Sequence, residues 1–123
     1  MKKLLILIIL FPILVAAQPR KESQEKALVH LVFVKFKEGV SIETFKEAAY
    51  EYLVPIAGVN DFQFSENVSP EGYERGYYHA FSMSFKNEEA RDKGYLPHPK
   101  HLAFGEKYWG AFIEDWMVYD YWK

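Results

Sequence analysis

Apolar and polar positions alternate most clearly over residues 77–85, with the period of two that is typical of a half-buried β-strand. Segments rich in β-branched and aromatic residues predict further strands at 29–36, 59–64 and 116–121. The bulky face of the 77–85 strand carries His79, Phe81, Met83 and Phe85, and its other face carries mostly small residues. We expect the bulky face to be covered by helices.

The segments between these strands have apolar residues at helical spacing or begin with residues that favour a helix start. Apolar residues recur at intervals of three and four over 42–53, directly after Ser41, which is a good N-cap. A second helix is expected from Glu88, with Asn87 as its cap. A third is expected from Pro99 towards the last strand, because proline is favoured at the first helical position.

The order β-α-β-β-α-α-β predicts the α+β class, with a ferredoxin-like split β-α-β fold and a four-stranded antiparallel sheet. Helices cover one face of such a sheet, and an aromatic content of 18% is too high for the second face to lie in water. Exposed apolar surfaces of that size are normally covered by a partner. We therefore expect a homodimer that packs sheet against sheet.

The N-terminal segment has the three parts of an export signal. Lys2 and Lys3 precede an apolar run over Leu4–Val15, and Val15–Ala17 is a small-residue cleavage site. The run is shorter than the roughly 20 residues that a membrane-spanning helix needs. We expect a secreted or periplasmic protein with no stable membrane anchor after cleavage.

The chain then divides into a signal peptide (1–17), a flexible lead-in (18–27) and one domain (28–123). A formal charge of −2 offers no basic excess for nucleic acid, so we expect no nucleic-acid partner. The absence of cysteine excludes disulfides, thiolate metal sites and a cysteine nucleophile.

The most specific motif of the chain is YLPHPKH in its second half, combined with a histidine near the start of the first strand. Further distinctive segments are His30–Lys37, Asn67–Gly72, Gly76–Phe81 and Val118–Tyr121, beside Tyr95–His101 itself. Together these segments resemble the stress-responsive α/β-barrel (Dabb) family.

The resemblance implies a ferredoxin-like subunit and a homodimer whose two sheets close into an α/β barrel. Some plant members of the family look like stress proteins without settled chemistry. Others are similar to polyketide cyclases, which use a pocket between sheet and helices. For that chemistry the motif match implies His101 as base and Tyr95 as hydrogen-bond donor to an enolate, with no cofactor.

Strand parity and the position of the last helix predict that all four histidines meet Tyr95 in one apolar cleft. Beside the pair His101 and Tyr95, we expect a ligand to contact His30, Val32, Val34, His79, Phe81 and His98.

Plainer interpretations stay open for the same residues. His98 either lines the cleft or only caps the last helix, and His30 and His79 are either ligand contacts or core histidines. His98 and His101 form a weak metal pattern without a nearby carboxylate, so no metal is expected.

The first function that we expect is binding of a small apolar or aromatic molecule outside the cytoplasm. The alternative is a cofactor-free enzyme that acts on a carbonyl substrate, as a lyase or cyclase or as a monooxygenase. A structural dimer without any cavity is the third.

Overall fold

The computed structural model describes residues 12, 13, 15–17 and 26–123. Most of the predicted signal peptide (1–17) and of the predicted lead-in (18–27) lies outside the described residues, so both stay predictions. In the part of the chain that is described, no helix combines the length and the apolar character needed to cross a membrane.

Four strands and a set of helical segments make up the domain. The strands are β1 (Leu28–Phe36), β2 (Asn60–Glu66), β3 (His79–Phe85) and β4 (Ile113–Trp122). The helical segments are α1 (Ile42–Leu53), the π-helix η1 (Ala90–Tyr95), α2 (Pro99–Phe104), the π-helix η2 (Gly105–Trp109) and α3 (Gly110–Phe112). The last three follow one another without a break, so the expected final helix is present with a π-helical centre.

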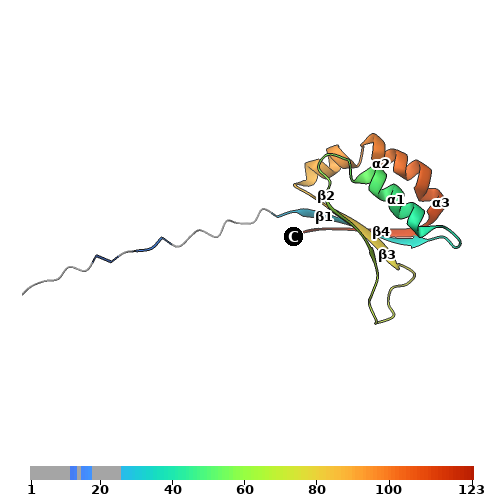
Figure 1. Ribbon diagram of the computed structural model, residues 1–123, viewed down its shortest axis with the longest axis horizontal. Helices are drawn as coiled ribbons and strands as arrows, with labels where there is room; N and C mark the ends of the chain where they lie inside the picture. Colours follow the sequence, from blue (N-terminus) through green and yellow to red (C-terminus); the bar gives the residue numbers. More distant parts are fainter. Residues whose placement is uncertain (1–11, 14, 18–25) are drawn as a thin grey trace, which may run out of the picture.

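The strands form one antiparallel sheet in the order β2-β3-β1-β4. All helical segments lie on the same side of it (Figure 1). The predicted ferredoxin-like architecture is therefore confirmed. Two strand starts differ from the prediction by two or more residues. β3 starts at His79 because the N–H of Tyr77 is held in a turn by the carbonyl of Glu74 (2.8 Å), and β4 starts early because Ile113 pairs with Phe36.

Side-chain caps account for where the helical segments begin. The Ser41 hydroxyl accepts a hydrogen bond from the N–H of Thr44 (3.2 Å), as expected of an N-cap. The Asn87 side chain accepts one from the N–H of Ala90 (2.9 Å) and so opens the segment that contains η1.

The two faces of the sheet differ as the alternation predicts. Val34, Met83 and Phe85 lie under the helices and are fully buried, and Phe45 of α1 packs onto this face in the centre of the core. On the open face the β4 residues Met117, Tyr119 and Tyr121 are 40–57% exposed. The fold therefore has a covered apolar layer on one side and an uncovered aromatic face on the other.

Candidate functional site

A cleft of about 310 Å³ lies between the sheet and the helical layer, at the β1–β4 side. Strands β1, β3 and β4 supply its floor, and the helical segments from η1 to η2 supply its roof. The floor consists of His30, Val32, Phe81, Trp116 and Val118; the roof consists of Tyr95, Leu96, His101, Phe104, Gly105 and Trp109. The lining is mostly apolar, with three polar side chains: His30 from β1, and Tyr95 and His101 from residues 95–101.

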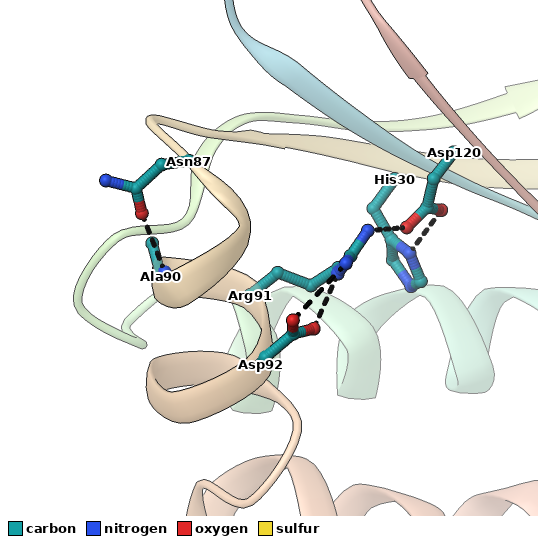
Figure 2. Close-up of polar contacts among 6 residues, drawn as sticks. All are labelled: His30, Asn87, Ala90, Arg91, Asp92 and Asp120. Atoms are coloured by element: carbon teal, nitrogen blue, oxygen red, sulfur yellow. Dashed lines mark hydrogen bonds and ion pairs between the residues drawn. The ribbon is translucent and has the colours of Figure 1, made fainter.

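His30 is the polar group of the floor, and its ring is oriented by a charged network. The register of β1 and β4 places it opposite Asp120, and its Nδ1 donates to Asp120 Oδ1 at 2.7 Å. The other oxygen of Asp120 accepts from the Arg91 guanidinium at 2.8 Å, and Arg91 also donates to Asp92 (Figure 2). These bonds to Asp92 and Asp120 raise the pKa of Arg91. With Nδ1 donating, the neutral His30 ring has its acceptor at Nε2.

His101 is held by the backbone instead of by a carboxylate. Its Nδ1 donates to the carbonyl oxygen of Leu96 at 2.8 Å, so its Nε2 is also an acceptor in the neutral ring. Burial lowers the pKa of His101. The Leu96 carbonyl opposes that shift, while the neighbouring His30 and His98 add to it. The ring is therefore neutral near pH 7 and competent as a proton acceptor.

Tyr95 closes the cleft between the two imidazoles. Its side chain is only 1% exposed, and its ring centroid lies 4.4 Å from that of His101 and 5.7 Å from that of His30. Among the described residues its hydroxyl has no hydrogen-bond partner, although no side-chain oxygen or nitrogen there is both fully buried and unpaired. The hydroxyl thus keeps some accessible surface. Burial raises the pKa of Tyr95, so the phenol stays protonated and can donate.

Four histidines were expected to line one cleft, and two of them, His30 and His101, do so. His30, Val32, Phe81, Tyr95 and His101 line the cleft as predicted from strand parity and motif position.

Val34, His79 and His98 do not line it. Val34 is fully buried in the core. His79 shares the face of Phe81 but pairs with Val34 at the opposite end of the strands, where Phe36 and Phe64 enclose its ring at centroid distances of 5.4 and 5.8 Å. The prediction from parity was wrong here because parity selects a face and says nothing about position along it.

His98 performs the capping role that the sequence left open. It is the N-cap of α2, and its Nδ1 accepts a hydrogen bond from the N–H of Lys100 at 3.1 Å. Its ring nitrogen is thereby used on the backbone, and the residue does not line the cleft.

Asp120 and Arg91 are the functional candidates that the sequence reasoning missed. The signal for Asp120 was available, since it is the single acidic residue among the aromatic and aliphatic residues 116–122, on the face of Val118. Arg91 had no such signal, because only the tertiary fold brings η1 next to the end of β4.

A second hollow of about 520 Å³ lies on the open face of the sheet. Its lining includes the polar residues Asp61, Gln63, Ser82, Ser84 and Lys123, and the Ser84 hydroxyl donates to the Asp61 carboxylate at 3.2 Å. The smaller cleft is the better candidate for a small molecule. Among the described residues, no three histidine, aspartate or glutamate side chains are grouped to hold a metal ion.

Comparison with known proteins decides the family. The model of the stress-responsive A/B barrel domain, Dabb, matches residues 28–123. The chain belongs to the Dabb family. It is 32% identical over 103 residues to the stress-response A/B barrel domain-containing protein HS1 of Arabidopsis thaliana, covering 81% of this chain and 93% of that protein.

Solved structures agree with this Dabb assignment. A Dabb family protein with a ferredoxin-like fold from Mesorhizobium loti is similar at a TM-score of 0.68 and 29% identity, over 78% of this chain and 95% of that one. A dimeric ferredoxin-like protein of unknown function from Jannaschia sp. CCS1 has a TM-score of 0.65 and 22% identity, over 77% and 97% of the two chains. The second likeness concerns the fold alone.

Proposed function

We propose that this Dabb protein binds a small apolar or aromatic molecule in the cleft between its sheet and its helices. The observation that carries the proposal is the meeting of His30, Tyr95 and His101 in an otherwise apolar cavity of about 310 Å³. Small-molecule sites typically have such volumes, with an apolar lining and a few convergent polar groups. The hydrophobic walls supply affinity and the three polar groups orient the ligand.

The proposed working form is an exported homodimer. Support for the dimer comes from the exposed Met117, Tyr119 and Tyr121 on the open face, and from the dimeric protein of Jannaschia sp. CCS1 with the same fold. Light scattering at micromolar concentration should give twice the subunit mass. For export, the mature protein should begin at Gln18; a secreted product that still begins at Met1 would contradict cleavage.

Binding can be tested with 4-nitroanisole, a small aromatic probe without a hydroxyl. Gly105 and Gly110 make a matched pair of variants, because both are helical and an added Cβ meets no atom within 4 Å at either. Only Gly105 lines the cleft. Gly105→Leu should weaken binding of the probe by about tenfold, or abolish it, because the leucine occupies ligand space. Gly110→Leu should bind as the unmodified protein does.

The measurement is equilibrium binding by absorbance or calorimetry, with the melting temperature of each variant as a check on folding. Replacing glycine by leucine inside a helix favours folding, so both variants should be at least as stable as the parent. Equal affinity in both variants, or no saturable binding of any small aromatic probe, would overturn the binding proposal.

Acid-base catalysis is the second candidate, because His101 and Tyr95 contact each other at the same cavity. Nε2 of a neutral His101 would take a proton from the carbon beside a carbonyl. The electron pair of that C–H bond would move to the carbonyl oxygen as an enolate, and the Tyr95 hydroxyl would donate to that oxygen. Each of these groups belongs to the protein itself.

Hydrogen–deuterium exchange at the methyl group of acetophenone, followed by NMR, tests this second candidate. The protein should accelerate the exchange, and His101→Ala and Tyr95→Phe should each lose that acceleration by about a hundredfold. Exchange at the buffer rate with bound acetophenone would leave binding as the function and exclude this chemistry.

A further inference from the structure

We propose that each cleft is shared between two copies of the chain. Its open side, along β4, is closed by the aromatic edge of the partner subunit, and the partner's Tyr50 is the residue contributed to the site. The inference rests on the proposed homodimer and on the proposed binding function. It adds which strands of the two copies pair and what each copy contributes to the cleft of the other.

The cleft is incomplete along β4, which is the last strand of the sheet. Trp116 and Val118 of β4 belong to the floor of the cleft, yet each is 50% exposed. Val32, one strand further in on the same floor, is only 3% exposed. In the described part of the chain no strand lies beyond β4, so this side of the cleft is open where the sheet ends.

β4 is an edge strand with apolar side chains exposed on both of its faces. An unprotected edge strand presents unpaired N–H and C=O groups that another chain can pair with. Met117 and Tyr119 are 50% and 57% exposed on the open face, while Trp116 and Val118 are exposed on the cleft side. A partner that covered only the open face would leave the cleft side in water. A partner strand paired with β4 covers both faces at once.

The shape of the open face selects the partner strand. Over β4 this face carries large side chains such as Met117 and Tyr119, and over β2 and β3 it carries Ser82 and Ser84 beside the hollow of about 520 Å³. A two-fold axis parallel to the strands places the large half of one sheet on the small half of the other. An axis across the strands would place the two large halves together. The first arrangement packs densely and brings β4 next to β2 of the partner.

The same axis determines the level at which the two strands meet. Three successive antiparallel pairings make β2 run opposite to β4, so the new pair is antiparallel too. One row across the sheet consists of Val118, Val32, Phe81 and Phe64. A two-fold rotation adds no shift along its axis, so the partner's Phe64 lies level with Val118, on the side of the cleft.

Tyr50 extends this aromatic edge towards the cleft. Its ring packs edge-on against Phe62 at a centroid distance of 4.9 Å, and Phe62 precedes Phe64 by two residues on the same face of β2. Tyr50 is 41% exposed and lines no part of the cleft in its own subunit. Across the paired strands the partner's Tyr50 lies beside Val118 and supplies the missing apolar wall.

Disulfide cross-linking tests the strand pairing, because the chain contains no cysteine. Gln63 and Tyr119 end one row of the open face, with Ser82 and Leu31 between them. Gln63→Cys combined with Tyr119→Cys should therefore form disulfides between subunits on mild oxidation and run as a dimer in non-reducing electrophoresis. Within one subunit the two positions are three strand spacings apart, about 14 Å, which is too far for a disulfide.

The single variant Tyr119→Cys is the control for the cross-linking. It should run as one subunit after the same oxidation, because β4 does not lie beside β4 of the partner. Efficient cross-linking of this single variant would mean that the axis runs across the strands. That result, or a dimer in which the double variant does not cross-link, would overturn the inference.

Binding of 4-nitroanisole tests the contribution of Tyr50. Tyr50→Ala should weaken binding by about threefold to tenfold through loss of aromatic contact, with the dimer mass unchanged in light scattering. Tyr73→Ala is the matched control, since Tyr73 is 76% exposed on the loop between β2 and β3 and lines no part of the cleft. It should bind the probe as the parent does.

A mixed dimer distinguishes a contribution to the partner's cleft from one within the same subunit. One copy carries Tyr50→Ala, the other carries Gly105→Leu, and two different affinity tags isolate the mixed species. The leucine blocks one cleft, and the remaining cleft belongs to the Tyr50→Ala copy but receives Tyr50 of the partner subunit. It should bind 4-nitroanisole with the affinity of the parent, at half the number of sites.

The outcomes separate this inference from the proposed function. If light scattering gives the mass of one subunit, the homodimer and the inference both fail, while binding is still decided by Gly105→Leu. If no probe binds, the binding function fails and takes the shared site with it. If the dimer binds 4-nitroanisole but Tyr50→Ala binds it as Tyr73→Ala does, or the mixed dimer keeps the weak affinity, each cleft belongs to one subunit and the inference is overturned.

Discussion

His30 and His79 lie on the same face of the same sheet, yet their surroundings differ in almost every respect. His79 is enclosed by the rings of Phe36 and Phe64, and burial lowers its pKa. His30 has a carboxylate at hydrogen-bond distance and an open cavity beside it. The comparison teaches that a histidine on a covered strand face lines a cleft or packs half-buried among aromatic rings according to what the helical layer places over it.

Over the two ends of the sheet the helical layer supplies different side chains. At the His79 end, Phe45 of α1 fills the space and packs against Phe36 and Phe64. At the His30 end, η1 contributes Arg91 and Tyr95, which pair with the strands but leave a hollow. The packed His79 end contributes stability, and the cleft at the His30 end leaves room for a ligand.

The largest loss of stability that we expect comes from removing the Phe45 ring at the His79 end. Phe45 is fully buried and packs against several other rings, so Phe45→Ala should lower the free energy of unfolding by about 3–5 kcal/mol. Urea denaturation followed by circular dichroism measures it. A loss below about 1 kcal/mol would show that the two ends do not differ as described.

Exchanging each histidine for phenylalanine sharpens the comparison. His30→Phe removes a hydrogen bond to a charged partner and should cost about 1.5–3 kcal/mol. His79→Phe should be neutral or slightly stabilising, because it places a ring of similar size among phenylalanines without losing a hydrogen bond to any described residue. Urea denaturation of both variants is the measurement. Equal losses of unfolding free energy would contradict the different roles given to His30 and His79.

A smaller effect is expected from pH. The folded-state pKa of His101 lies below its ordinary value of 6.5, mainly through burial, so the unfolded chain binds the proton more readily. The stability contributed by the neutral ring is complete above about pH 6.5 and is lost as the pH falls through the folded-state value. Unfolding curves measured above and below this pH should show that the free energy of unfolding falls less at acidic pH in His101→Gln than in the parent. An unchanged pH dependence would contradict the shift.

The smallest effect should come from Tyr95→Phe. Its hydroxyl has no partner among the described residues, so the free energy of unfolding should change by less than about 0.5 kcal/mol. Thermal and urea denaturation check this. A large loss would mean that the hydroxyl is a structural group and not one available to a ligand.

The fold was predictable because its signals are local. Alternation over 77–85, helical spacing over 42–53 and the Ser41 cap each indicate an element that the structure contains. The π-helical segments η1 and η2 were not predictable, since insertion of one extra residue per turn depends on how the helix packs onto the sheet.

The candidate site was predictable only in part. Strand parity and the position of the YLPHPKH segment correctly predicted that His30, Tyr95 and His101 lie at one cleft. The same strand parity wrongly predicted His79 at that cleft. The ion pair of Arg91 with Asp120 joins residues from η1 and β4, and no pattern along the chain encodes such a contact.

The last helix has a π-helical centre, so the roof of the cleft contains more residues per turn than an α-helix would. A π-helical turn holds about one residue more than an α-helical turn, so removing a single residue from η2 would restore ordinary α-helical winding and leave the residues beyond it in phase. The side chains within η2, Trp109 of the cleft among them, would change direction. The extra residue of η2 is therefore as much a part of the binding architecture as the side chains themselves.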